Sequence, residues 1–344
     1  MRKTAVLIAF GLAATTLSVP VHAAAKPAAD CVATVLPFPP GMPTGSRTDV
    51  TKADDTGRYV VGRVLSDEGT WPVLWADGVA RLLEDAPGSD ASVVDVNSSG
   101  TVLGVSLAKD GTTLPWVFAN GVYKELVQPD YMGGTTSPTA INNRGDVVGA
   151  GMSTVTDAPA SLLWPAGGPA RVLYTPDDEP SFVTDINDAG VVIGSTKIII
   201  NGRDYDIGIR WTDWTQEGER VYGQDKSISQ LTEIRGNYTG GNQRSLDTGL
   251  FGGLIWDDLR ERFHSVPTAT GVLNNSGDAV ASTDEGEDVV VAFDGTKRWV
   301  FPERTRIATL MDRTRALGPQ AAGTNGGFNA ERAVLWHGCN DAMR

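Results

Sequence analysis

The sequence predicts an all-β fold, a seven-bladed β-propeller with four-stranded blades, from two repeating patterns and a lack of helical periodicity. Apolar strands that end in an aromatic residue recur at Trp75, Phe118, Trp164, Trp211, Trp256, Phe293 and Trp336. The gaps between them are 43, 46, 47, 45, 37 and 43 residues, which is the length range of a propeller blade. No long segment after residue 24 shows convincing helical periodicity.

A turn motif keeps the same period upstream of each aromatic residue. Its sharpest copies run from Ile141 to Gly149 and from Ile186 to Gly194. In each copy an apolar strand runs into Asn, whose side chain caps a turn, and Gly supplies the positive φ that closes it. We therefore expect a hairpin between the first two strands of each unit. The fifth and seventh copies, Glu233 to Gly241 and Leu310 to Gly323, are degenerate.

Each unit is expected to hold about four strands. In the third unit they are residues 138–142, 146–151, 160–164 and 171–174, separated by polar or glycine-rich turns. The predicted blades are 48–90, 91–134, 135–180, 181–227, 228–268, 269–302 and 303–339. The last unit stops after its third strand, so we expect residues 32–36 to supply the missing strand. Closure of this kind removes two exposed sheet edges.

The two cysteines, Cys31 and Cys339, stand near opposite ends of the chain. If the terminal strands pair, the two thiols can lie close enough to form a disulfide. Closing so long a loop would stabilise the fold by roughly 5 kcal/mol in the chain-entropy model. The alternative is two unrelated free thiols, but an even cysteine count in an exported protein favours the disulfide.

Residues 1–23 have the features of a secretory signal peptide. Arg2 and Lys3 precede an apolar stretch from Ala5 to Ala14, and Val21-His22-Ala23 forms a small-residue cleavage site. We expect a secreted, extracellular protein in which residues 24–344 form one propeller domain. The formal net charge of −13 argues against nucleic acid as a partner and against docking on anionic membrane lipid.

The sequence carries no recognisable catalytic or metal-binding motif, so we predict no catalytic residues, no metal and no cofactor. The only histidines after the signal peptide are His264 and His337, and neither belongs to such a motif. Two alternatives stay open. Turns such as Asp185 to Gly190 could bind calcium, but they do not match the spacing of a calcium loop, and Asx capping of a repeated hairpin is the favoured explanation. A glycoside-cleaving enzyme needs two facing carboxylates, which could come from different blades.

The Ile-Asn-x-x-Gly core of the turn motif resembles the bacterial extracellular repeat family named after a His-Ala-Phe (HAF) signature, and secreted bacterial β-propellers more broadly. The name-giving tripeptide is absent from this sequence. The architecture and the predicted export also resemble the propeller lectin subunits of the umbrella-shaped toxin particles that Streptomyces secretes. This second resemblance implies a non-catalytic protein that binds cell-surface carbohydrate and grips a small secreted adaptor protein in a larger assembly.

In propellers of this kind, connections between blades and loops between second and third strands share one face. Aromatic, acidic and amide side chains on such loops suit sugars, because a pyranose stacks on an aromatic ring while polar groups bind its hydroxyls. The predicted ligand-binding residues are Trp71, Asp130, Tyr131, Asp177, Asp178, Asp204, Tyr205 and Asp206. The glycine-rich fifth unit could leave a cleft for a partner's strand, which makes Asn237, Tyr238 and Asn242 the predicted partner-binding residues.

Taken together, these observations predict a secreted, lectin-like binding module that recognises cell-surface carbohydrate and docks an adaptor protein within a toxin assembly. The main alternative is a glycan-active hydrolase or lyase with carboxylates at the mouth of the central channel. A third alternative is a purely structural extracellular protein.

Overall fold

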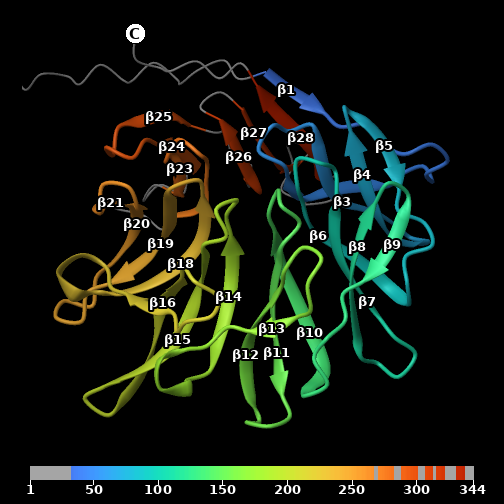
Figure 1. The fold of residues 1–344 in the computed structure, drawn as a ribbon. Coiled ribbons are helices and arrows are strands. Elements are labelled where there is room, and N and C mark those ends of the chain that lie inside the picture. Colours follow the sequence, from blue (N-terminus) through green and yellow to red (C-terminus); the bar gives the residue numbers. More distant parts are fainter. Residues whose placement is uncertain are drawn as a thin grey trace, which may run out of the picture.

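The computed structural model describes residues 32–266, 270–282, 288–300, 307–312, 315–321 and 331–337. These residues form seven four-stranded antiparallel sheets, with two short 3-10 helices in the connections. Figure 1 shows the sheets following one another around a common centre, in the order of the chain. The all-β propeller architecture is therefore present.

Six of the sheets are blades built from four consecutive strands, and the first strand of each lies nearest the centre. Their strands are β2 (Arg47–Ala53), β3 (Tyr59–Ser66), β4 (Gly69–Ala76) and β5 (Val79–Leu82) in the first blade; β6 (Ser89–Val96), β7 (Val102–Leu107), β8 (Thr113–Ala119) and β9 (Val122–Glu125) in the second; β10 (Met132–Ile141), β11 (Val147–Ser153), β12 (Ala158–Trp164) and β13 (Arg171–Val172) in the third; β14 (Ser181–Ile186), β15 (Val192–Ile200), β16 (Arg203–Trp211) and β17 (Glu219–Val221) in the fourth; β18 (Ile228–Arg235), β19 (Tyr238–Arg244), β20 (Phe251–Asp257) and β21 (Arg262–Val266) in the fifth; β22 (Thr270–Leu273), β23 (Ala279–Ser282), β24 (Asp288–Val291) and β25 (Lys297–Val300) in the sixth.

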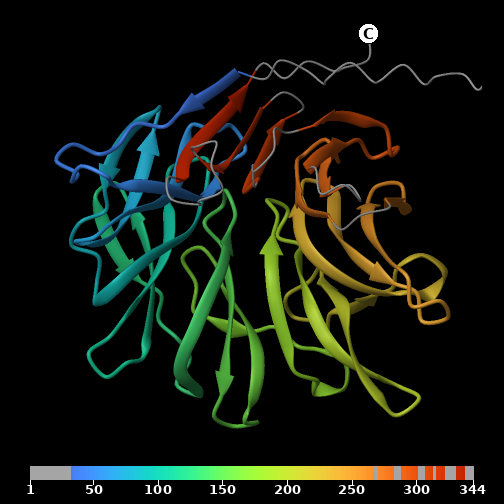
Figure 2. The same ribbon diagram turned by 180° about the vertical axis from the view of Figure 1, so that it is seen from behind.

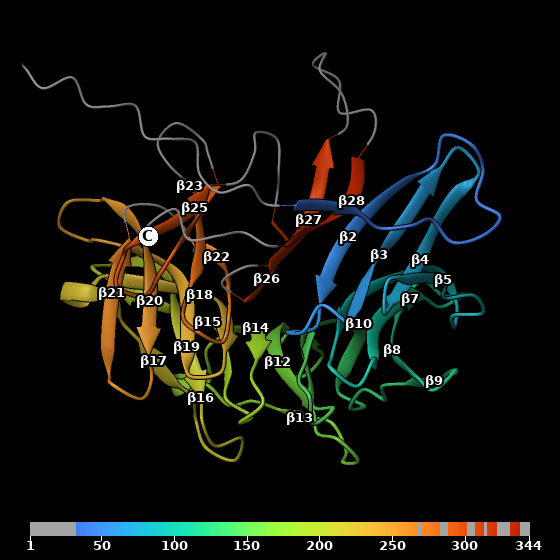
Figure 3. The same ribbon diagram turned by 90° about the horizontal axis from the view of Figure 1, so that it is seen from above.

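The remaining sheet is composite. It joins β26 (Thr309–Asp312), β27 (Arg315–Ala321) and β28 (Glu331–His337) to β1 (Val32–Val35), with Val32 opposite His337. Figures 2 and 3 show β1 beside β28 from two further directions. The predicted count of seven repeat-built blades is thus corrected to six self-contained blades of four strands. The physical reason is that the last repeat has only three strands, so its sheet borrows the fourth from the other end of the chain.

The recurring tryptophans fix the connections between sheets. Trp75, Trp164 and Trp211 are buried at the ends of third strands. Each indole Nε1 donates a hydrogen bond to a backbone carbonyl of the connection before its own blade, at 2.7 Å to Pro37, 2.9 Å to Val127 and 2.6 Å to Tyr174. A buried indole needs such a partner, and here the same bond ties a loop to the blade. In the second blade Trp116 is fully buried beside the predicted Phe118.

A β-bulge interrupts the first strand of each blade, where the register with the second strand shifts by one residue. A glycine of the second strand faces the bulge in the first five blades. A Cβ atom added to Gly62 would lie 2.0 Å from the Asp49 carbonyl oxygen. A Cβ atom added to Gly241 would lie 2.1 Å from the Gln230 carbonyl oxygen. The repeated Val-Val-Gly ending of the motif therefore places a glycine where the backbones of the first and second strands approach closely.

The fifth blade is regular, contrary to the expectation of a degenerate unit. β18 and β19 pair from Ile228 to Arg244, and β19 pairs with β20 along its whole length. Gly241 keeps the glycine that the bulge requires. No strand-sized gap is therefore left between β18, β19 and β20.

Candidate functional site

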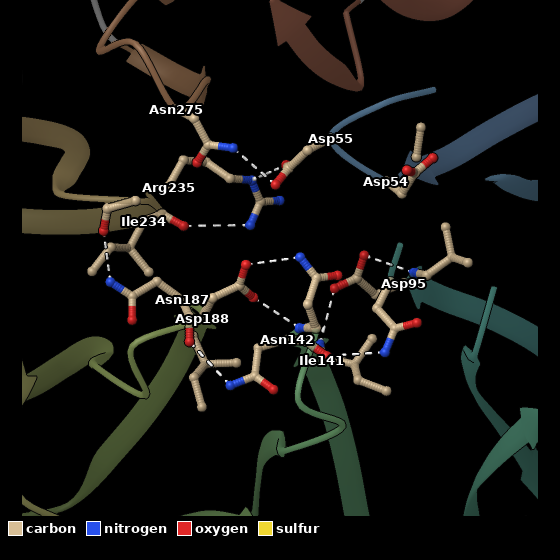
Figure 4. Close-up of a pocket in the computed structure, with 16 residues that line it drawn as sticks. Asp54, Asp55, Asp95, Ile141, Asn142, Asn187, Asp188, Ile234, Arg235 and Asn275 are labelled. Carbon is tan, nitrogen blue, oxygen red and sulfur yellow. Dashed lines mark hydrogen bonds and ion pairs between the residues drawn. The ribbon is translucent and has the colours of Figure 1, made fainter. Parts of the chain in front are cut away.

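The Asn turns of the motif lie at one end of the propeller, around the central axis (Figure 4). Asn142 shows their double role. Its Oδ1 accepts hydrogen bonds from the backbone N–H groups of Arg144 and Asp146, which caps its own turn. Its Nδ2 donates to the carbonyl oxygen of Asn187 in the next blade at 3.0 Å.

The same inter-blade bond repeats on both sides of Asn142. The Asn97 Nδ2 donates to the Asn142 carbonyl at 3.0 Å, and the Asn187 Nδ2 donates to the Gly236 carbonyl at 2.7 Å. We call this chain of amide-to-carbonyl bonds the asparagine clasp. It joins the second, third, fourth and fifth blades in one direction, so the motif is a device for holding blades together.

Carboxylates placed by the bulges add a second set of inter-blade bonds. Asp95, Asp185 and Glu233 each stand two residues before the turn position that Asn occupies in most blades. Each accepts a backbone N–H from the following blade: Asp95 from Ile141 at 3.0 Å, Asp185 from Ile234 at 2.9 Å and Glu233 from Leu273 at 2.6 Å. All three side chains are buried.

Two cations complete a buried cluster across the central channel. Lys52 of the first blade contacts Glu233 of the fifth, with 2.7 Å between Nζ and Oε1. Arg235 contacts Glu233 at 2.8 Å, Asp185 at 3.3 Å and Asp55 at 3.7 Å. Figure 4 shows Arg235 pointing toward Asp55 inside the ring of turns. The Lys52–Glu233 and Arg235–Asp55 pairs thus join the first and fifth blades, which are not neighbours in the chain order.

The environment of the cluster shifts the pKa values of its acids in opposite directions. Burial raises the pKa of Asp95 to about 6, although Lys52 and Arg235 partly offset this effect. Burial likewise raises the pKa of Asp185. For Glu233 burial acts in the same sense, but the adjacent Lys52 and Arg235 outweigh it and hold the pKa below its ordinary value. The cations thus keep Glu233 charged.

The pocket inside the ring of turns is too small for a sugar. It offers about 30 Å³ to the centre of a water-sized sphere. A single water needs roughly 10–15 Å³ by this measure, so the pocket has room for about two waters. A drug-sized ligand occupies a pocket of about 300 Å³ or more. The contacts of the carboxylates at this channel mouth are structural, because each accepts a backbone N–H group of the following blade.

The eight predicted ligand-binding residues all lie toward the opposite end of the blades. Trp71 begins a third strand, Asp130 and Tyr131 precede β10, and Asp177 and Asp178 form a 3-10 helix before β14. Asp177 pairs with Arg220 at 3.0 Å. Asp204, Tyr205 and Asp206 lie in β16. These last three line one groove, whereas Trp71, the Asp130–Tyr131 pair and the Asp177–Asp178 pair lie at three other places.

That groove lies between the fourth and fifth blades, and we call it the β16–β19 groove. It has a volume of about 280 Å³. One wall carries Asp204, Tyr205 and Asp206, and the other is built from β18 and β19 with Phe251 at its rim. Asn242, which was predicted as a partner-binding residue, lines the same groove.

The polar side chains in and beside the β16–β19 groove differ in their contacts. The Asn242 Oδ1 is buried and accepts no hydrogen bond within the described part of the chain. The Lys197 Nζ is 3.7 Å from the Asp206 carboxylate, and the Arg244 guanidinium stands over the Phe251 ring at 5.1 Å from its centroid.

A larger hollow of about 740 Å³ lies between the first and second blades. Thr70 and Pro72 line it, but Trp71 between them does not, because neighbouring residues of a strand point to opposite faces. Its only cation, Arg63, forms an ion pair with Asp49 at 3.0 Å. This hollow therefore lacks the aromatic contact that made Trp71 a predicted ligand-binding residue.

The other predicted partner-binding residues do not share a surface with Asn242. Asn237 is exposed in the β18–β19 turn, at the asparagine-clasp end. Tyr238 packs against Phe293 with 5.7 Å between ring centroids. Cys31 and Cys339 lie outside the described residues.

The sequence interpretation missed the clasp and the charge cluster. A signal was available, because the first, second, fourth and fifth repeats carry a charge at the same position, where the third has Ala140. The four charged residues are Lys52, Asp95, Asp185 and Glu233. A second signal was Arg235, which stands where the third and fourth repeats have Asn. Both mark charges at the propeller centre.

Two further findings concern metals and membranes. Among the residues that the structure describes, no three His, Cys, Asp or Glu side chains are grouped to hold a metal ion. Within the same ranges, none of the helices has the length and apolar character needed to cross a bilayer.

Comparison with solved structures identifies the fold. The β-propeller domain of the trilobed protease from Pyrococcus furiosus, described as having an open velcro topology, matches with a TM-score of 0.59 and 11% identity, covering 87% of this chain and 96% of that one. Oligogalacturonate lyase from Vibrio parahaemolyticus matches with a TM-score of 0.59 and 8% identity, covering 91% and 95%. Acylaminoacyl peptidase from Pyrococcus horikoshii matches with a TM-score of 0.56 and 13% identity, and the match spans 86% of this chain and 52% of the peptidase.

No protein-family model and no curated protein matches this chain. The structural matches include proteins named as enzymes, and their propellers share the present architecture at 8–13% identity. Similarity at this level concerns the backbone and leaves function to the residues of each site. The chain is, on this evidence, a β-propeller.

Proposed function

We propose that this protein is a secreted, non-catalytic binding module that holds cell-surface carbohydrate in the β16–β19 groove. The observation that supports the proposal is a groove whose lining combines Tyr205 and Phe251 with the acidic residues Asp204 and Asp206. Sugars need such a combination, because their C–H faces pack on aromatic rings while their hydroxyls need hydrogen-bond partners.

The size of the groove supports a short glycan. Its volume of about 280 Å³ is close to the lower end of small-molecule sites, which begin near 300 Å³. The groove is therefore suited to one or two sugar rings, with the remainder of a surface glycan extending into solvent. β19 is paired on both sides, so it has no free edge for an extended peptide.

The contacts of the channel carboxylates support a non-catalytic role. Asp95, Asp185 and Glu233 accept backbone N–H groups and face a space of water size. A glycosidase needs two carboxyl groups on either side of a sugar ring. The hydrolase or lyase alternative therefore has no favourable geometry at this channel mouth.

A glycan array followed by titration calorimetry tests the carbohydrate proposal. We expect the wild-type protein to bind a defined set of glycans without releasing product, and Tyr205→Ala to weaken binding by about tenfold. Tyr174→Ala is the matched control, because Tyr174 is exposed outside the groove. Equal binding by both variants, or release of sugar by the wild type, would contradict the proposal.

We further propose that a small secreted adaptor protein docks on the hairpin tips of the third to fifth blades, within a larger toxin assembly. Apolar side chains are exposed there on three neighbouring hairpins: Val155 is 77% exposed, Ile199 66% and Leu250 71%. Apolar side chains exposed on neighbouring hairpins are the kind of group that a protein partner can cover.

Capture experiments from culture supernatant test the docking proposal. The wild type should retain a small secreted protein, and the double variant Ile199→Asp/Leu250→Asp should lose it. Val79→Asp is the control, since Val79 is 70% exposed in the β4–β5 hairpin at the other end of a blade. Retention by the double variant would place any partner elsewhere.

A further inference from the structure

We infer that the outer edge of β1 pairs with β1 of a second copy of this chain, so that two composite sheets join into one continuous sheet. This inference does not depend on the proposed carbohydrate binding. It starts from the position of β1, which is the last strand of its sheet and pairs only with β28 among the described strands. Figure 1 shows β1 at the margin of the ring.

The backbone of β1 presents hydrogen-bonding groups along this edge. The Leu36 N–H donates to the Ala333 carbonyl at 2.8 Å, so in the alternating antiparallel pattern Thr34 also directs its N–H and C=O groups toward β28. The N–H and C=O groups of Ala33 and Val35 therefore point away from β28. All the side chains of β1 are exposed, so no other described part of the molecule covers the strand.

The sequence of β1 differs from that of the other outer strands in its charge. Each outer strand of the six self-contained blades carries at least one Lys, Arg or Glu residue. Examples are Arg81 in β5, Lys124 in β9, Arg171 in β13, Glu219 in β17, Arg262 in β21 and Lys297 in β25. Charged side chains on an edge strand hinder its pairing with other chains. β1 reads Val-Ala-Thr-Val, so its edge lacks this protection.

The absence of charge fits a second copy as the partner. In a two-fold antiparallel pair each strand faces its own sequence, so a charged residue would lie near the same charge of the other copy. β1 avoids this repulsion. When the pair is centred on Thr34, Ala33 lies opposite Val35 of the second copy, and the outward N–H and C=O groups of these two residues meet.

The contact is short, so the dimer is weak. Stable interfaces bury about 800 Å² per partner and use about 20–30 residues a side, whereas β1 has 4 residues. We expect a dissociation constant on the order of 100 μM. Such a dimer carries two copies of the β16–β19 groove, so weak contacts of both grooves with one surface can add up.

Sedimentation velocity of the secreted protein, from about 1 to 500 μM, tests the inference. We expect the wild type to shift from monomer to dimer across this range. Ala33→Lys/Val35→Lys places like charges opposite each other and should raise the dissociation constant about tenfold or more. Val79→Lys/Val122→Lys is the matched control and should dimerise as the wild type does. These two residues are 70% and 66% exposed on the outer strands of the first and second blades.

A mixture of variants separates loss of the edge contact from loss of the fold. Ala33→Glu/Val35→Glu should also be monomeric alone, whereas an equimolar mixture with the lysine variant should form dimers, because opposite charges then face each other. The inference is wrong if the wild type stays monomeric throughout the range, if the lysine variant dimerises as the control does, or if the mixture stays monomeric. None of these results bears on glycan binding, which the array measures separately.

Discussion

At the scale of single residues, the same side chains cap turns and join blades. Asn142 holds two N–H groups of its own turn and one carbonyl of the next blade. Asp95 does the equivalent with a carboxylate, which accepts the Val96 N–H in its own strand and the Ile141 N–H across the blade boundary. The stability of the ring therefore depends on a few buried polar groups, because a buried donor or acceptor left unpaired is costly.

Removing the Asn142 side chain should destabilise the protein. The Asn142→Ala variant removes the inter-blade hydrogen bond to the Asn187 carbonyl and leaves two turn N–H groups without partners, so we expect the free energy of unfolding to fall by about 1–3 kcal/mol. Chemical denaturation measures the change. Gln216→Ala, at an exposed position, should stay within about 0.5 kcal/mol of the wild type. An equal response of the two variants would show that the clasp is energetically unimportant.

Asp95 makes stability depend on pH. Its pKa is raised from 3.8 to about 6 by burial, so between these values the folded state holds a proton that the unfolded state has lost. This contribution is present below pH 4 and is lost as the pH rises toward 6. The gap corresponds to about 3 kcal/mol.

Denaturation at a series of pH values tests this effect. The unfolding free energy of the wild type minus that of Asp95→Asn should fall between pH 4 and pH 6.5, because asparagine does not titrate. The exposed Asp247→Asn serves as the control and should show no such slope. A difference between wild type and Asp95→Asn that is independent of pH would mean that Asp95 is charged throughout this range.

At the scale of elements, hairpins were predictable from sequence and bulges were not. The strands expected at residues 146–151 and 160–164 correspond to β11 and β12, since Asn, Gly and β-branched residues specify such hairpins locally. The bulge in each first strand arises from pairing between two strands, so no local pattern announced it. Its trace was the glycine opposite it, such as Gly149, inside an apolar strand.

The candidate site was predictable only in part for the same reason. Loop chemistry brought Asp204, Tyr205 and Asp206 to attention, and these three line one groove. Asn242 was assigned to a different role because the fifth unit looked irregular. Which loops of neighbouring blades face each other depends on the twist and packing of sheets, which a repeat spacing does not contain.

Two adjacent glycines of β19 test the importance of the bulge. A Cβ at Gly241 would lie 2.1 Å from the Gln230 carbonyl oxygen, whereas one at Gly240 would meet Leu273 only at 3.8 Å. Gly241→Ala should therefore lower stability by about 2 kcal/mol or more through backbone displacement. Gly240→Ala should be neutral or stabilising by up to about 1 kcal/mol, because alanine restricts the unfolded chain. Thermal unfolding of the two variants decides between these outcomes, and a reversed order would contradict the bulge geometry.

At the scale of the whole molecule, the two ends of the described chain meet in one sheet. β1 pairs with β28, and Val32 lies opposite His337. Cys31 directly precedes the first of these residues, and Cys339 follows the second by two positions. We therefore propose that a disulfide joins the cysteines and secures the composite sheet.

Mass spectrometry of secreted, non-reduced protein checks this proposal. A single peptide pair linking Cys31 to Cys339 is expected, and Cys31→Ser should lower the free energy of unfolding by up to about 5 kcal/mol. Recovery of both cysteines as free thiols, or no loss of stability in the serine variant, would show that strand pairing alone closes the ring.

The placement of the asparagine clasp and the charge cluster also bears on how this molecule can change over time. Both lie at one end of the propeller, while the β7–β8, β11–β12, β15–β16 and β19–β20 hairpins project at the other. Lengthening or exchanging the tip of one of those hairpins does not touch the asparagine clasp or the charge cluster. These hairpins can thus change in length and sequence during evolution while the residues of the clasp and the charge cluster stay the same.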